Sequence, residues 1–88
     1  MARIGRDVRG PLVIAETDSE RDLLHFGRTR GGEVVLLEGL YPVRGNALVL
    51  PESLSLRGAR RVCLALQQAA GAHQEAQRRR RKFLLIKG

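Results

Sequence analysis

The sequence predicts a small α+β domain in which a three- or four-stranded sheet packs against a short N-terminal helix and a longer C-terminal helix. Three observations lead to this prediction. Short runs rich in Val, Leu and Ile are bounded by Gly, Pro and Asn, as strands commonly are. A helix-capping pattern follows the first of these runs. The second half contains a long Ala- and Gln-rich segment whose apolar residues recur at helical spacing.

The N-terminal residues divide into an arm and a first strand. Residues 1–10 include three Arg and two Gly and show no apolar periodicity, which predicts a flexible basic arm. A single small α+β domain would then span 11–88. Its first strand is predicted at 12–15, a short apolar run that directly follows Pro11.

A short helix is predicted next. Thr17 and Glu20 have capping-box spacing, in which a hydroxyl and a carboxylate bind the free backbone N–H groups of a helix start. The helix should cover about residues 19–28. It should end near Gly27 or at the Gly31-Gly32 pair, where a left-handed backbone costs little.

Two further strands form a predicted hairpin. The run 34–37 has the strongest strand character in the chain and could continue past Gly39 as a bulge, and 47–50 is the second strand. Between them, 42–46 has the composition of a turn. Pro51 closes the hairpin because proline cannot donate a hydrogen bond to a continuing ladder.

The C-terminal half is predicted to be mainly helical. Residues 52–58 have no clear period and form either a loop or a short helical turn. A helix is expected over 59–77, although the apolar run 62–66 also fits a buried strand, and Gly71 either ends a first helix or is tolerated within one. The apolar segment 83–86 is expected to dock as an edge strand or to insert into a partner.

Net charge is confined to the C-terminal part of the chain. Residues 1–50 carry seven Arg and seven acidic residues, whereas 51–88 carry nine Lys and Arg against two Glu, which leaves the whole net charge of +7. Arg outnumbers Lys fourteen to two, which suits fork-like binding of phosphate but is also what a GC-rich genome would encode. A neutral scaffold with a cationic surface indicates a polyanion or an acidic protein as partner.

The run of five cations at 78–82 is the strongest functional signal. Adjacent cations repel one another, and a phosphate backbone would neutralise them while releasing its own counterions. We therefore expect a non-enzymatic nucleic-acid-binding protein or accessory subunit that contacts the phosphates of DNA or RNA with little sequence discrimination. The candidate contact residues are all cationic and all lie in the C-terminal part: Arg60, Arg61, Arg78, Arg79, Arg80, Arg81, Lys82 and Lys87.

Other roles for this run stay open. Cations near the end of a helix complement its dipole, and basic residues beside an apolar edge strand block aggregation. The alternative function is a protein-interaction or assembly module, in which the basic rim and the segment 83–86 dock on an acidic protein.

The spacing of the cations suggests how a helix would present them. Arg60 and Arg78 are 18 residues apart, which on a continuous helix is five turns and about 27 Å along one face. Such a helix could follow a duplex backbone. If Gly71 breaks the helix, this alignment is lost.

Catalytic, metal and cofactor sites are not expected. Cys63 is the only cysteine, and neither His25 nor His73 has a second ligand at metal-binding spacing. Phe26 and Tyr41 lie beside apolar residues, as does Phe83, so core positions are expected and no stacking platform for bases is evident.

One pattern near the N-terminus resembles a known enzyme family. A strand that ends in Leu-Val-Ile-Ala-Glu16 and precedes a helix is similar to the start of a Toprim domain. That resemblance implies acid-base work by Glu16 beside a magnesium site. Such domains also need an Asp-x-Asp pair after a later strand, which is missing here. Helix capping explains the acidic residues near Thr17 without an active site.

Length and hydropathy set the remaining expectations. A chain of 88 residues buries only about 60 to 65% of its unfolded surface, so a homodimer that adds to the core is a further expectation. The sequence has no signal peptide and no long apolar span, which predicts an intracellular, cytoplasmic protein with no membrane partner.

Overall fold

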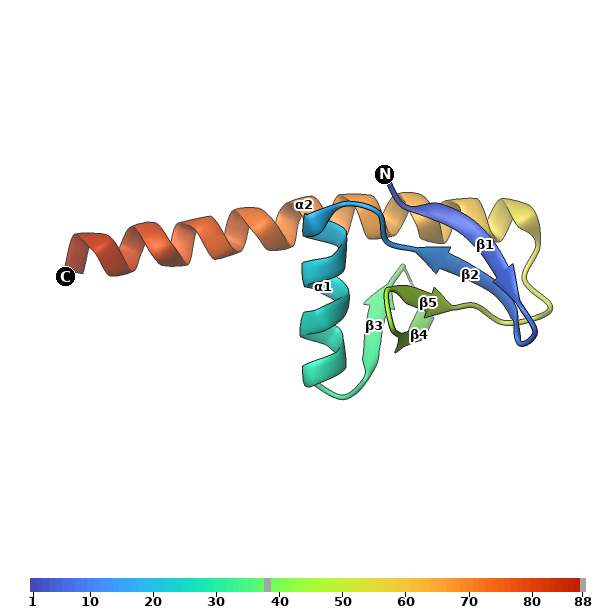
Figure 1. Cartoon of the computed structure of the whole chain (residues 1–88). Helices are drawn as coiled ribbons and strands as arrows, with labels where there is room; N and C mark the ends of the chain where they lie inside the picture. The colour runs from blue at the N-terminus through green and yellow to red at the C-terminus, as the bar shows by residue number, and fades with distance from the viewer. Residues whose placement is uncertain (38, 88) are drawn as a thin grey trace.

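Five strands and two helices make up the part of the chain that the structure describes. The computed structural model describes the backbone of residues 1–37 and 39–87 and the side chains of residues 1–37 and 39–79. The elements in chain order are β1 (Arg3–Asp7), β2 (Gly10–Ile14), α1 (Asp18–Thr29), β3 (Glu33–Leu36), β4 (Gly39–Arg44), β5 (Ala47–Val49) and α2 (Leu56–Lys87). The predicted α+β class is confirmed, with one or two strands more than expected (Figure 1).

The strands form one antiparallel sheet in the order β1-β2-β5-β4-β3. Three pairs are hairpins between neighbours in the chain, and β2 pairs with β5, where Val13 lies opposite Leu48. Helix α1 connects β2 to the far edge strand β3. The two ends of the sheet are therefore held together by the central β2–β5 pair.

Both helices cover the same face of this sheet. Alternation along the strands turns Val13 and Leu48 toward the helices, where they join Leu24 of α1 and Val62 and Leu66 of α2 in one core. These five are the largest fully buried side chains among the described residues. Burial of a Val or Leu side chain contributes about 1.5–3 kcal/mol, so this cluster is the main source of stability.

Helix α1 begins and ends at the predicted signals. The Glu20 N–H donates to Thr17 Oγ1 at 3.2 Å, and the Thr17 N–H donates to the Glu20 carboxylate at 3.0 Å, so the capping box is present. At the other end, Gly32 has a φ of 82° and its N–H donates to the Gly27 carbonyl at 2.9 Å. The helix therefore stops at the Gly31-Gly32 pair.

The prediction of a flexible arm over residues 1–10 is wrong. Arg3–Asp7 form β1, which pairs with β2 along its full length. Ala2 is buried and Ile4 packs against the core, while Arg6 is exposed. The single apolar residue Ile4 gives no visible alternation, and the strand forms because β2 offers its edge to these backbone groups.

The turn predicted at 42–46 is shorter than expected. Pro42 belongs to β4, and only Gly45 and Asn46 separate β4 from β5. Gly45 has a φ of 63°, which is typical of two-residue hairpin turns. Pro42 is tolerated within β4 because the ladder with β5 contains only Val43 and Arg44, so no β5 carbonyl requires its missing N–H.

Helix α2 is one continuous element from Leu56 to Lys87. The alternative of a buried strand at 62–66 is wrong, and Gly71 lies within the helix. The expectation of an edge strand at 83–86 is also wrong, because the backbone there is helical. No Pro and no Gly interrupts 72–87, so the helix started on the core propagates outward.

The length of α2 sets the shape of the molecule. Its 32 residues span about 48 Å at 1.5 Å per residue, close to the longest molecular dimension of 50 Å. The first half lies over β1 and β2, and the second half extends past α1 and away from the rest of the protein (Figure 1).

Candidate nucleic-acid interface

The first turns of α2 present a cationic face to solvent. Arg57, Arg60 and Arg61 are all exposed, whereas Ala59 and Val62, which lie between and beside them in the sequence, are buried. A helix turns by about 100° per residue, so these two sets lie on opposite sides of it. Arg57 was not among the predicted contact residues, because 52–58 showed no clear apolar period and no helix was predicted there. The structure places it in the first turn of α2, next to Arg60 and Arg61.

The second cationic group follows on the same face. Helix α2 is continuous across Gly71, so Arg60 and Arg78 lie five turns apart on one side, a separation of about 27 Å. Arg79, which follows Arg61 by the same 18 residues, lies beside Arg78 and is also exposed. The side chains of Arg80, Arg81, Lys82 and Lys87 lie outside the described residues, and their backbone continues the helix.

We name the set Arg57, Arg60, Arg61, Arg78 and Arg79 the outer face of α2. In the N-terminal half, three arginines pair with acids of the same half: Arg3 with Glu16, Arg21 with Asp18, and Arg44 with Asp7. The other four arginines of that half form no ion pair with a described residue.

On the outer face of α2, only Arg79 pairs with a described residue. Its partner is Glu75, at 3.4 Å. Both of these side chains are mostly exposed, so the pair contributes little. The N-terminal half carries equal numbers of acidic and basic residues, so the net charge of +7 is left on residues 51–88, which contain α2.

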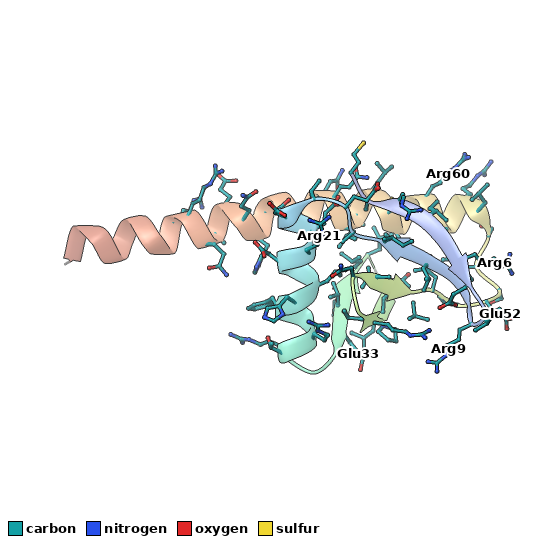
Figure 2. All side chains as sticks on the ribbon, viewed as in Figure 1. Arg6, Arg9, Arg21, Glu33, Glu52 and Arg60 are labelled. Carbon is teal, nitrogen blue, oxygen red and sulfur yellow. The ribbon has the colours of Figure 1, made fainter. Side chains whose placement is uncertain are left out.

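The β1–β2 hairpin brings further cations to the N-terminal end of α2. Figure 2 shows Arg6 and Arg9 on this hairpin, at the same end of the molecule as Arg60. Both are exposed, and neither forms an ion pair with a described residue. The pairing of β1 with β2 holds Arg6 in place. Sequence analysis assigned these arginines to a flexible arm and so missed their position.

The acidic residues near α1 have structural partners. Glu16, the residue that the Toprim resemblance would make catalytic, is exposed after β2 and pairs with Arg3 at 3.4 Å. Glu20 is buried, and its carboxylate accepts hydrogen bonds from the backbone N–H groups of Ala2, Glu16 and Thr17. Burial alone raises the pKa of Glu20, but these N–H groups outweigh it and hold the pKa below its ordinary value.

The sulfur and imidazole groups show no metal-binding arrangement. The Cys63 thiol is buried and donates to the Ala2 carbonyl at 3.2 Å. Burial raises its pKa, and the nearby Glu20 carboxylate raises it further. No cluster of three or more His, Cys, Asp or Glu side chains among the described residues could hold a metal ion.

Comparison with known proteins adds no relative. No protein family, no curated protein and no solved structure matches the chain. Within the described part of the chain, neither helix is both long and apolar enough to cross a bilayer. The function must therefore be argued from the chemistry of the surface itself.

Proposed function

We propose that this is a non-enzymatic nucleic-acid-binding protein or accessory subunit that contacts the phosphate backbone through the outer face of α2 and the basic run 78–82. The observation that supports it most is the unbalanced charge of the C-terminal part. The whole net charge of +7 lies in residues 51–88, and Arg57, Arg60, Arg61 and Arg78 are exposed and have no ion-pair partner among the described residues.

Phosphate is the anion that best fits this surface. A guanidinium group donates two parallel hydrogen bonds to phosphate oxygens and stays charged when it is partly dehydrated. Uncompensated like charges on one helix repel one another, so binding of a polyanion also relieves repulsion within the protein. A straight helix with cations about 27 Å apart can contact phosphates that are well separated along a duplex or along an extended single strand.

The test is binding measured as a function of salt. We expect fluorescence anisotropy with labelled duplex DNA, single-stranded DNA and RNA to give dissociation constants that rise steeply with salt. For about five phosphate contacts on duplex DNA, a plot of the logarithm of the association constant against the logarithm of the salt concentration should have a slope near −4 to −5. Replacing Arg60 and Arg61 by Gln should make that slope about 2 units shallower, because each lost contact removes about 0.9.

A matched variant separates this surface from net charge alone. Arg21→Gln with Arg44→Gln removes the same two charges from exposed positions outside α2. This control should leave the slope within about 0.5 units of the wild type. Equal losses in the two variants would contradict a role for the outer face of α2.

Two results would overturn the proposal. If the wild type binds none of the three nucleic acids, the proposed function fails. If the protein instead binds an acidic protein partner at high salt, and the Leu84→Ser/Leu85→Ser variant abolishes that binding, the interaction-module alternative is favoured.

A further inference from the structure

A polar cleft lies between α1 and α2, beside the start of the basic run. It has a volume of about 340 Å³ and opens to solvent. Asp22, His25 and Phe26 line it from α1, and His73, Gln77 and Arg78 line it from α2. Its size is near the lower limit for small-molecule sites, so it suits one small planar group and its substituents rather than a peptide.

The wall of the cleft contains planar groups in contact with one another. The Arg30 guanidinium lies over the Phe26 ring at 4.7 Å, and the rings of Phe26 and His73 are 4.9 Å apart with a tilt of 53°. Phe26 was expected in the core, but it is only half-buried and packs against these two polar groups. A planar ring that enters here meets aromatic surface, which binds any nucleobase because every base has a π-face.

The polar groups around this aromatic wall are not used elsewhere. Among the described residues, the side chains of Asp22, Gln77 and Arg78 have no hydrogen-bond or ion-pair partner. Asp22 and Arg78 have opposite charges and face the same cleft without pairing. A ligand that satisfies both must carry an anion for the guanidinium and a hydrogen-bond donor for the carboxylate.

The His25 ring also lines the cleft. The Arg28 guanidinium, which can only donate, lies 3.4 Å from His25 Nδ1. The cleft therefore combines hydrogen-bond donors, the Asp22 carboxylate as an acceptor, and an aromatic wall. It also contains the Gln77 amide, which can both donate and accept a hydrogen bond. These are the groups that recognise the edge of an unpaired base.

We propose that the cleft between α1 and α2 binds one unstacked nucleotide of a single-stranded nucleic acid. The base stacks against Phe26 and His73 with its edge toward Asp22 and Gln77, and its phosphate contacts Arg78. This inference rests on the proposed function and extends it, because a duplex keeps its bases stacked and cannot fill the cleft. Arg78 belongs to both surfaces, so a strand that follows α2 can place one base in the cleft.

The experiment has two arms. In the first, adenosine 5′-monophosphate and inorganic phosphate are titrated separately into ¹⁵N-labelled wild type and followed by NMR. The nucleotide should shift the resonances of His73 and of the Gln77 side-chain amide, and inorganic phosphate at the same concentration should not. Equal shifts with both ligands would mean that the cleft binds a simple anion, and no shift with either would mean that it binds no nucleotide; each result overturns the inference.

The second arm compares polymers. Phe26→Leu with His73→Ala removes the aromatic wall and should weaken binding of single strands about fivefold or more while leaving duplex binding within about twofold. The control is Arg60→Gln/Arg61→Gln, which should weaken both polymers alike. Thermal unfolding followed by circular dichroism shows whether the variants fold, and the nucleotide titration of the wild type does not depend on them.

The outcomes separate the two proposals. If the wild type binds single strands and duplex and the double variant loses neither, the cleft proposal fails and the phosphate-binding function stands. If the wild type binds no polymer but the mononucleotide still shifts His73, the proposed function fails, and the cleft is a site for a free nucleotide and not for a nucleotide of a single strand.

Discussion

The Glu20→Ala substitution should remove a large part of the stability of the protein. Glu20 is 2% exposed, and its carboxylate accepts hydrogen bonds from the N–H groups of Ala2 at 2.8 Å and of Glu16 and Thr17 at 3.0 Å each. The first of these bonds joins the start of β1 to α1 and is buried. The substitution therefore leaves one buried donor without a partner and removes the carboxylate half of the capping box, while the Thr17 hydroxyl still accepts from the backbone N–H of residue 20.

The magnitude follows from these three donors. An unsatisfied buried N–H costs about 1–3 kcal/mol, and the two partly buried donors, which can reach water, cost about 0.5–1.5 kcal/mol each. The total is about 2–6 kcal/mol. A chain of this length has a free energy of unfolding of about 4–13 kcal/mol, so the variant should be marginally folded or unfolded.

The pH dependence provides a second measurement. Because the folded protein holds the pKa of Glu20 below its ordinary value of 4.5, the ionised carboxylate stabilises the fold at pH values above 4.5. That stabilisation is lost as the pH falls through the lower, folded pKa. The difference in unfolding free energy between wild type and Glu20→Ala should therefore be largest near neutral pH and should shrink in acid.

Urea unfolding followed by circular dichroism measures both effects. The matched control is Glu16→Ala, which removes a carboxylate that is 44% exposed and paired with an exposed Arg3. It should cost about 0.5 kcal/mol or less. If Glu20→Ala is no less stable than Glu16→Ala at neutral pH, the argument from the buried carboxylate is refuted.

Two further substitutions and one thiol reaction test the packing. Gly27→Ala should cost about 1–3 kcal/mol, because its Cβ would lie 2.5 Å from Val34 Cγ2; unchanged urea stability would refute this. Gly71→Ala should instead gain about 0.5–1 kcal/mol, because open space surrounds that position inside α2, and a loss would argue against a continuous helix. The Cys63 thiol, buried and with a raised pKa, should react with a disulfide reagent much more slowly in the native protein than in urea, and equal rates would show that it is accessible.

Local signals explain which elements sequence analysis could predict. The Thr17 and Glu20 pair forms bonds within four residues, so the start of α1 is visible in a short window. The apolar period of α2 is likewise local, and it outweighed the strand character of 62–66 because the helix buries Val62 and Leu66 together.

Pairing between distant segments explains what could not be predicted. Strand β1 has one inward apolar residue, Ile4, and forms because β2 is available as a neighbour. Pro42 was assigned to a turn because it normally ends a strand, and it is accommodated in β4 only because the β5 ladder stops before it. The third hydrogen bond of Glu20 depends on Ala2, which lies 18 residues away.

The sequence by itself determined the distribution of charge along the chain and the face of the helix that carries it. The surplus of +7 lies entirely in the C-terminal part, and a spacing of 18 residues places Arg60 and Arg78 on one side of any continuous helix, because charge and helical period are properties of the chain alone.

Only the tertiary structure decided which charges are paired and where a cleft opens. Arg44 is neutralised by Asp7, 37 residues away, and the cleft joins Phe26 to His73 across more than half of the chain. Ion pairs and clefts depend on distances through space, which are set when the strands pair and the two helices pack on one face of the sheet.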